Sequence, residues 1–263
     1  MKYQVHSITS QGKYHQRNED AFFISDDFII VADGMGGERD GDIASKLAVD
    51  TIAGILMEGA FKKTDELQIK YLLQEAIDCA DSKIIEYIDR NPDSFGMGTT
   101  ILVTMRHDNS LFISWCGDSR CLSYKKGHLV SLTKDHSYVQ GLVDAGVITV
   151  KESYTHPDNN LITRYVGGGK GTCMTDFKFH PLSESEIIIL CSDGLSGYCQ
   201  LKDIEKVISG NKDISQLPEQ LKNLAVSHGS DDDITIVVLS PQTCSSGYYV
   251  DSISGWFKKV LHL

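Results

Sequence analysis

The sequence predicts one α+β domain built in layers, on the evidence of two long helical segments, eight short β-rich runs and the short turns between them. Residues 42–58 and 65–90 carry apolar side chains at helical spacing. The β-rich runs are 3–9, 21–25, 28–32, 99–105, 110–115, 119–124, 186–191 and 234–239. Short hairpin-like turns join several of them and favour antiparallel pairing over repeated βαβ units.

Each helical segment has a predicted buried face. In 42–58 the apolar positions of this face are Ile43, Leu47, Ile52, Ile55 and Leu56. In 65–90 they are Leu67, Tyr71, Leu72, Ile77, Ile84, Ile85 and Ile88. Amphipathic helices of this kind bury the apolar stripe against a sheet.

Two segments interrupt or follow the predicted domain of residues 1–240. Residues 136–172 are rich in polar side chains and glycine, with one short helical piece, and we interpret them as an inserted surface flap. The tail 241–263 carries Ile253, Trp256, Phe257, Val260 and Leu261 at helical spacing. This tail is either an amphipathic appendage or a segment that packs on the domain's own surface.

Composition narrows the class of function. The 263 residues are 41% hydrophobic, enough for a full core, and the net charge of −11 argues against nucleic-acid binding through clustered Lys and Arg. No run resembles a secretory signal or a transmembrane segment. Seven cysteines without paired spacing fit a reducing compartment, so we expect a cytoplasmic protein.

Acidic residues stand at the ends of strongly apolar runs at several separate places. Carboxylates that converge at strand ends must take up protons unless a cation compensates their charge. Oxygen ligands without Cys/His pairs favour Mg²⁺ or Mn²⁺ over Zn²⁺. These acids are Glu19 and Asp20, Asp33, Asp193, and the run Asp231 to Asp233.

The stretch VADGMGGERDG, residues 31–41, combines Asp33 with several glycines. It could form a tight turn, a phosphate-cradling loop, or a metal site in which the Asp33 carboxylate and the Gly34 carbonyl are ligands. A single Asp-Gly pair after a strand is more often a turn. The repetition of acids at other strand ends favours the metal site, with Gly36 and Gly37 turning the chain toward the next helix.

A pair of such ions supports hydrolysis of phosphate esters. Two hard ions activate water near neutral pH and neutralise charge on the phosphoryl group, so that no covalent protein nucleophile is needed. The sequence contains no G-x-S-x-G, Cys-x5-Arg or G-x-x-x-x-G-K-[ST] motif, which agrees with this chemistry.

Eight ordered motifs carry a resemblance to a known family. They are NEDA (18–21), VADGMGG (31–37), GTT (98–100), GDSR (117–120), LTKDHS (132–137), LITRYVGG (161–168), CSDGL (191–195) and DDITIVV (232–238). In this order and spacing the chain resembles bacterial members of the metal-dependent protein phosphatases of type 2C, the PPM class. The resemblance spans about residues 5 to 240 and excludes the tail.

The resemblance implies a fold and a set of site residues. The fold is a four-layer αββα sandwich of two mainly antiparallel sheets flanked by helices, with two Mn²⁺ or Mg²⁺ ions at one edge. Asp33 would bridge both ions, Gly34 would give a carbonyl, and Asp193 and Asp232 would ligate one ion. Glu19 would hold the other ion directly or through water. Asp20 would orient metal-bound waters, and Asp118 would support a weaker third ion or else cap the following strand.

One departure from the family pattern concerns the phosphate contact. The family usually has Arg four residues before the Glu of NED, and this chain has His15 there. Arg17 lies on the same face as His15 if the stretch is extended. We expect His15, Arg17 or both to hold the substrate phosphate, and favour Arg17 because its charge persists above pH 7. Alternatively, Arg17 pairs with surface acids.

Three further residues are ambiguous in the sequence. Asp233 stands where the family commonly has Asn, so it could tighten metal binding or compete with Asp232; we retain Asp232 as the ligand. His136 in KDHS is expected to be structural. His156, in the flap, is expected to contact substrate, and a general-acid role is chemically sensible for it.

The sequence thus predicts a cytoplasmic protein-serine/threonine phosphatase. Its substrates would be phosphoproteins, including targets of a cognate Ser/Thr kinase, and Asp33, Asp193 and Asp232 would be its central catalytic ligands. Two other classes remain open. One is a catalytically silent module of the same fold that binds phosphoproteins, and the other is a scaffold that docks through the tail to a membrane or partner.

Overall fold

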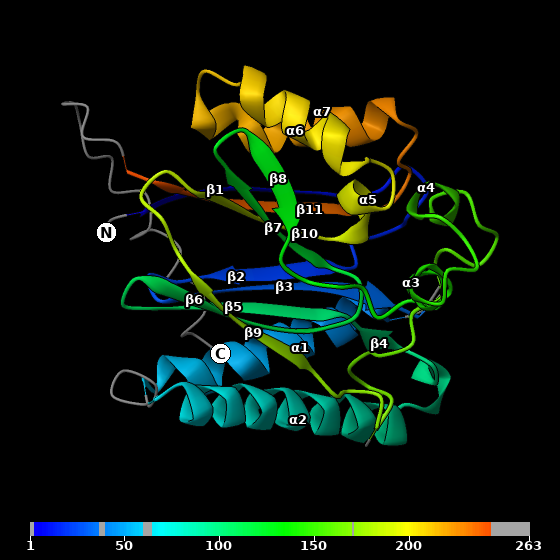
Figure 1. Ribbon diagram of the computed structural model, residues 1–263. Coiled ribbons are helices and arrows are strands. Elements are labelled where there is room, and N and C mark those ends of the chain that lie inside the picture. Colours follow the sequence, from blue (N-terminus) through cyan, green and yellow to red (C-terminus); the bar gives the residue numbers. More distant parts are fainter. Residues whose placement is uncertain (1–2, 37–39, 60–64, 170, 243–263) are drawn as a thin grey trace.

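Four layers of secondary structure form the molecule. The computed structural model describes residues 3–36, 40–59, 65–169 and 171–242. Two β-sheets lie face to face, and helices cover the outer face of each (Figure 1). This arrangement confirms the α+β, αββα sandwich that the sequence and its family resemblance predict.

The first sheet has the strand order β1-β11-β10-β7-β8, with every pair antiparallel. Its strands are β1 (Tyr3–Ser10), β7 (Arg120–Lys125), β8 (His128–Ser131), β10 (Ile187–Cys191) and β11 (Ile234–Pro241). The second sheet has the order β2-β3-β5-β6-β9, and β4 extends it by pairing with β3. Its strands are β2 (Asp20–Ile24), β3 (Phe28–Met35), β4 (Gly98–Thr99), β5 (Ile101–His107), β6 (Ser110–Cys116) and β9 (Asp176–Pro181).

Helices of different length cover the two sheets. The long helices α1 (Gly41–Met57) and α2 (Glu66–Arg90) lie on the second sheet, and α6 (Leu201–Gly210) and α7 (Leu217–Ser227) lie on the first (Figure 1). A short helix α5 (Asp193–Ser196) follows β10 directly. Two 3₁₀ turns, η2 (Pro92–Ser94) and η3 (Ile214–Gln216), precede β4 and α7.

Three apolar clusters hold the layers together. One includes Ile52 and Ile77 between the long helices and the second sheet, and another includes Ile204 and Leu221 between α6, α7 and the first sheet. The third, with Val31 and other residues of both sheets, fills the space between the sheets. Because both sheets are buried on both faces, their strands read as nearly continuous apolar runs.

The buried face of α2 agrees with the prediction at Ile77 and Ile84 and differs from it in the first turns of the helix. Leu67 and Tyr71 are 59% and 62% exposed, whereas Ile69 and Leu73 are fully buried. The Asp65 side chain accepts a hydrogen bond from the backbone of Gln68 and forms a capping box, which fixes the helix start as predicted. Further along the helix, small residues such as Ala76 and Ala80 complete the buried face. The prediction did not include them because it considered only large apolar side chains.

The segment 136–172 contains two short helices, α3 (Tyr138–Asp144) and α4 (Val150–Ser153). An isolated bridge between Ser137 and Ile162 lies within the segment, and a second bridge, between Val166 and Thr99 of β4, connects it to the sandwich. The predicted amphipathic part of the tail lies outside the described residues. Within the described ranges, no helix has the length and apolar character needed to cross a lipid bilayer.

Candidate metal centre

Acids from both sheets converge at one edge of the sandwich. Asp20 and Asp33 are register partners in β2 and β3, so their side chains leave the second sheet on the same face. Asp193 begins α5, immediately after β10 of the first sheet, and Asp232 precedes the adjacent strand β11. Asp33 and Asp232 both shift the pKa of the Asp193 carboxyl, so the three side chains lie near one another.

The electrostatics of these acids show how closely they lie together. Burial raises the pKa of Asp20 and of Asp193 to about 7, and the repulsion of neighbouring carboxylates adds to the rise. Burial, followed by the charges of Asp193 and Asp20, raises the pKa of Asp33 well above its ordinary value. Burial also raises the pKa of Asp232. Without a cation, burial and mutual repulsion therefore favour protonation of these carboxyls.

Gly34 lies inside β3, because this strand continues two residues past Asp33 rather than ending in a turn. Its N–H donates to the Glu19 carbonyl at 3.1 Å. A Cβ at Gly34 would lie 2.1 Å from the carbonyl oxygen of Gly41 and 2.6 Å from that of Glu19. Glycine is therefore required here by the close approach of three backbone segments.

Glu19 also lies close to Gly34 and Gly41. A Cβ at Gly41 would come within 2.3 Å of its Oε2 atom, which places the carboxylate against the start of α1. Burial raises the pKa of Glu19 to about 7; the charge of His15 opposes this, and Asp233 and Asp42 add to it. Glu19 is thus part of the same electrostatic cluster.

Asp118, between β6 and β7, is buried beside Asp193. Burial and then the charge of Asp193 raise its pKa well above the ordinary value, while Arg120 lowers it. Asp118, Asp193 and Asp33 therefore affect one another's pKa values, and the role of these acids as metal ligands stays a prediction. Two oxygens of the cluster, Oδ1 of Asp20 and Oδ1 of Asp193, are buried without a hydrogen-bond partner among the described residues. Such oxygens, in an all-oxygen donor set, fit a hard divalent cation.

Asp233 has a different role from its neighbour Asp232. Its Oδ1 accepts the Gly12 N–H and its Oδ2 accepts the Glu19 N–H, both at 2.6 Å. His15 Nδ1 lies 3.0 Å from the same Oδ2. His15, Asp232 and Asp233 offer ligand atoms within 4.8 Å of one another. Since both Asp233 oxygens are occupied by backbone donors, we interpret Asp233 as a brace for residues 12–19.

The two predicted phosphate contacts have separate surroundings. His15 Nε2 lies 3.7 Å from Asp232 Oδ1, and the hydrogen bond with Asp233 raises the pKa of His15. Arg17 is 70% exposed and its Nη1 lies 3.3 Å from Asp42 Oδ2. In this structure, His15 contacts a predicted ligand and Arg17 pairs with an acid at the start of α1.

The histidines of the flap region also have distinct partners. His136 is buried; its Nδ1 accepts the Gly117 N–H at 3.1 Å, and its Nε2 lies 3.3 Å from Asp176 Oδ2. These are the contacts of a structural residue, as expected. His156 Nδ1 accepts the Asp158 N–H within the flap.

Several supporting residues were not assigned from the sequence. Ser192 Oγ donates to Asp20 Oδ2 at 2.8 Å and accepts the Thr235 N–H, so it links the two sheets beside the acids. Thr99 Oγ1 donates to the Asp33 carbonyl and Thr100 Oγ1 accepts the Asp33 N–H. Ser192 belongs to the motif CSDGL, and Thr99 and Thr100 belong to GTT. These motifs were the only indication in the sequence that the three residues lie near the site.

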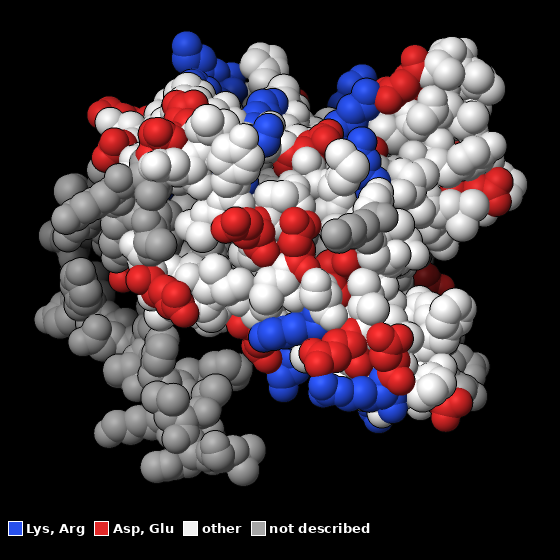
Figure 2. All heavy atoms as spheres, turned by 90° about the horizontal axis from the view of Figure 1, so that it is seen from below, with Lys and Arg blue, Asp and Glu red and all other residues white. Residues whose placement is uncertain are grey.

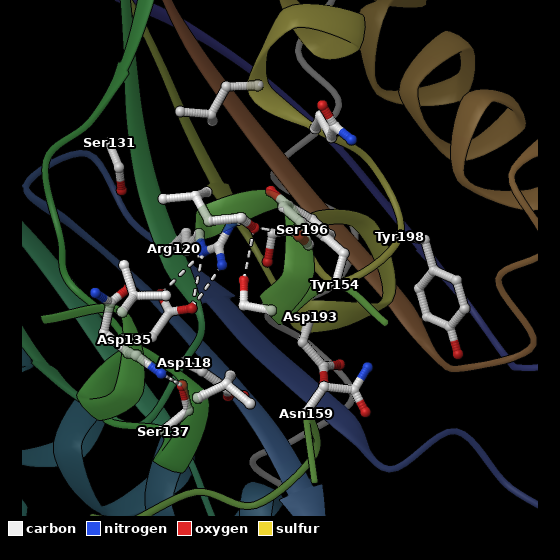
Figure 3. Close-up of a pocket in the computed structure, with 18 of the residues that line it drawn as sticks. Asp118, Arg120, Ser131, Asp135, Ser137, Tyr154, Asn159, Asp193, Ser196 and Tyr198 are labelled. Atoms are coloured by element: carbon white, nitrogen blue, oxygen red, sulfur yellow. Dashed lines mark hydrogen bonds and ion pairs between the residues drawn. The ribbon is translucent and has the colours of Figure 1, made fainter. Parts of the chain in front are cut away.

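A pocket of about 730 Å³ opens beside the acids. Asp118, Asp193 and Asp232 line it together with the flap and the α5–α6 segment, and Figure 3 shows Arg120 and Tyr154 within it. Arg120 forms a two-point ion pair with Asp135, with Nε–Oδ1 at 2.9 Å and Nη2–Oδ2 at 2.6 Å. Asp118, Asp193 and Asp232 are thus reachable from a cavity large enough for a ligand.

Comparisons with known proteins agree with this geometry. The family model "Protein phosphatase 2C" matches residues 9–225. The chain is 32% identical over 248 residues to the serine/threonine phosphatase stp of Listeria monocytogenes, covering 91% of this chain and 96% of that protein.

Solved structures extend the comparison to the whole fold. The Streptococcus agalactiae serine/threonine phosphatase superposes with a TM-score of 0.84 at 30% identity, covering 92% of this chain and 100% of the other. The catalytic domain of the protein phosphatase PstP, solved in complex with two manganese ions, gives a TM-score of 0.80 at 28% identity, covering 90% and 97% of the two chains. The chain therefore belongs to the protein phosphatase 2C family and is a protein phosphatase.

Proposed function

We propose that this chain hydrolyses phosphoserine and phosphothreonine in proteins, with two Mn²⁺ or Mg²⁺ ions held by the acid cluster. The observation that carries the proposal is the convergence of Asp33, Asp193 and Asp232, with a buried Asp193 oxygen that has no partner among the described residues. The names of the similar phosphatases and the two manganese ions of the PstP structure support it.

The residues present fit a dinuclear site. Asp33, Asp193 and Asp232, together with Glu19 and the Gly34 carbonyl, would hold the ions. When bound, such ions lower the pKa of water and neutralise charge on a phosphoryl group. Asp20, fixed by Ser192 Oγ, would orient water, and the buried Asp118 beside Asp193 would serve a third ion.

His15 and Arg17 would orient the substrate phosphate. His15 Nε2 lies 3.7 Å from Asp232 Oδ1, and the hydrogen bond with Asp233 raises the pKa of His15, which extends the imidazolium form to higher pH. Arg17 would act by exchanging its exposed pairing with Asp42 for the phosphate. Exposed ion pairs are weak, so this exchange costs little.

The proposed partners are phosphoproteins, including targets of a cognate Ser/Thr kinase, in the cytoplasm. A nucleic-acid partner is disfavoured by the net charge of −11. On the face seen in Figure 2, Lys and Arg lie among Asp and Glu and form no continuous basic band.

Release of phosphate from a phosphothreonine peptide, with and without Mn²⁺, tests the proposal. We expect Mn²⁺-dependent hydrolysis that a chelator abolishes and that Asp33→Asn lowers by more than about a hundredfold, since even residues supporting a ligand typically contribute 10–100-fold. Asp50→Asn, at an exposed position of α1, is the matched control. Hydrolysis that survives chelation would contradict the proposal, and binding of the peptide without cleavage would favour the silent binding module.

A further inference from the structure

The pocket beside the acid cluster has walls that the proposed metal chemistry does not use. Beyond Asp118, Asp193 and Asp232, its lining comes from β7, β8 and residues 133–137, from α3, α4 and the loop after α4, and from residues 196–202. Figure 3 shows Tyr154 of the flap near Arg120 and Tyr198 across the pocket. His15 and Arg17 do not line it. A substrate whose phosphate lies at the acid cluster would therefore extend its neighbouring residues into a separate space.

Within the described residues, two of the basic side chains that line this pocket are paired with acids and two are not. Arg120 is neutralised by Asp135, and Lys134 pairs with Asp144 at 2.6 Å. Lys151, on α4, and Lys202, on α6, are exposed and have no ion pair within the part of the chain that the structure describes. In a chain with net charge −11, two unpaired cations thus face a pocket that begins at the proposed metal centre.

We infer that Lys151 and Lys202 select substrates that carry an acidic side chain close to the phosphorylated residue. The acid is a carboxylate or a second phosphate, because lysine binds either as a point charge. Complementary charge at an interface contributes specificity even where each exposed pair is weak. This inference rests on the proposed phosphatase function and names the substrates that it prefers.

The test uses the Mn²⁺-loaded full chain and peptides with one phosphothreonine. A single Glu is moved through the flanking positions, with Gln at the same positions as the reference and a second phosphoserine as a separate series. At one or two positions we expect kcat/KM to be roughly five- to tenfold higher for Glu than for Gln, as two exposed pairs allow. A preference for phosphoserine alone would identify phosphate as the preferred anion, which also supports the inference.

Charge variants assign the preference to the two lysines. In K151Q/K202Q the Glu-to-Gln ratio of kcat/KM should fall to about one, and in K151E/K202E it should fall below one. The matched control is K70E/K83E, which changes the same charge at two exposed positions of α2. This control should keep the wild-type ratio.

Two results would overturn the inference. In one, the wild-type enzyme cleaves Glu, Gln and phosphoserine peptides equally well. This measurement does not depend on the folding of any variant. In the other, the preference persists in K151E/K202E. Absence of Mn²⁺-dependent cleavage of every peptide and of p-nitrophenyl phosphate would instead refute the proposed function, so the two failures are distinguishable.

Discussion

Asp233 is adjacent to the proposed metal ligand Asp232, but its side chain accepts hydrogen bonds from the backbone. Its two oxygens accept N–H groups of Gly12 and Glu19, and the first of these bonds is buried. A carboxylate at this position was ambiguous in the sequence, because adjacent acids can both be ligands. The contacts with residues 12–19 come from more than 200 positions away in the chain and distinguish the two roles.

Asp233→Ala should lower the free energy of unfolding by about 2 to 4 kcal/mol, because it leaves two backbone donors without their charged acceptor. Asp233→Asn keeps one acceptor and should cost less. Urea unfolding of the metal-free protein measures both. If Asp233 were a ligand instead, Asp233→Asn would leave metal-free stability unchanged and weaken Mn²⁺ binding as strongly as Asp232→Asn.

His15 should make phosphate binding depend on pH. The hydrogen bond with Asp233 raises its pKa above the usual value of 6.5, so the imidazolium persists to higher pH and is lost as the pH rises through that pKa. As the pH rises through the pKa of His15, we expect KM for p-nitrophenyl phosphate to rise about three- to tenfold in the wild type, because a charged contact with the phosphate is lost.

In His15→Gln, KM should be high already at low pH and should lose this dependence. In Arg17→Ala, KM should rise at every pH, with the pH dependence retained. Superimposable pH profiles of KM for the wild type and His15→Gln would remove His15 from phosphate binding.

At the scale of elements, helix α2 holds the loop that supports the metal centre. The buried Asp81 accepts the N–H groups of Gly167 and Gly169 at 2.7 and 3.2 Å. The adjacent Val166 bridges to Thr99 in β4, and Thr99 donates to the Asp33 carbonyl. A continuous series of contacts therefore joins the core-facing side of α2 to a proposed ligand.

Asp81→Ala should lower the free energy of unfolding by about 2 to 3 kcal/mol, since two backbone donors lose a charged acceptor. It should also raise the Mn²⁺ concentration needed for half-maximal activity, because the support of Asp33 loosens. Asp81→Asn retains an acceptor and should recover most of both effects. Asp89→Ala, at an exposed position of the same helix, is the control. A stable Asp81→Ala with unaltered Mn²⁺ dependence would show that the loop needs no anchor on α2.

The elements that the sequence predicted well are those with a strong local signal. Helix α1 and helix α2 are long, and α2 has a capping box at Asp65. Strands β8 and β9 were missed, because β8 has four residues and β9 is at the sheet edge with few buried side chains. Helices α6 and α7 have only 10 and 11 residues, and they were also missed.

The residues of the candidate site also differ in how strong their local signal in the sequence is. The proximity of Asp33, Asp193 and Asp232 could be predicted because each stands at the end of an apolar run, and their role as ligands stays a prediction. Ser192 and Asp81 could not, since their role depends on partners 172 and 86 positions away. A short motif can mark a ligand, but it does not specify which distant backbone or side chain positions that ligand.

At the scale of the whole molecule, the sandwich brings like charges together across its two sheets. Asp20 and Asp33 belong to the second sheet, and Asp193 and Asp232 adjoin the first. Packing the sheets therefore compresses a cluster of carboxylates whose mutual repulsion opposes folding when no cation is bound. Folding and the proposed metal binding would be linked through these groups.

This linkage predicts how stability depends on pH. The folded-state pKa of Asp193 is about 7, above its ordinary value of 3.8. Between these values the folded protein binds the proton more tightly than the unfolded chain, so the contribution of Asp193 to metal-free stability falls as the pH rises from about 4 to 7. Asp193→Asn removes this titration. In chelator, the variant should therefore be more stable than the wild type at pH 8, by of order 3 kcal/mol, and the difference should shrink toward pH 5.

Excess Mn²⁺ should reverse the order of stability. A cation stabilises the ionised carboxylates of the wild type, and Asp193→Asn lacks one of them, so at pH 8 the wild type should unfold at the higher temperature. Thermal unfolding at pH 5 and pH 8, with chelator and with Mn²⁺, gives the four required comparisons. If the metal-free wild type is as stable as Asp193→Asn at pH 8, burial and the neighbouring carboxylates do not disfavour the ionised Asp193, and the electrostatic basis of the proposed metal centre fails.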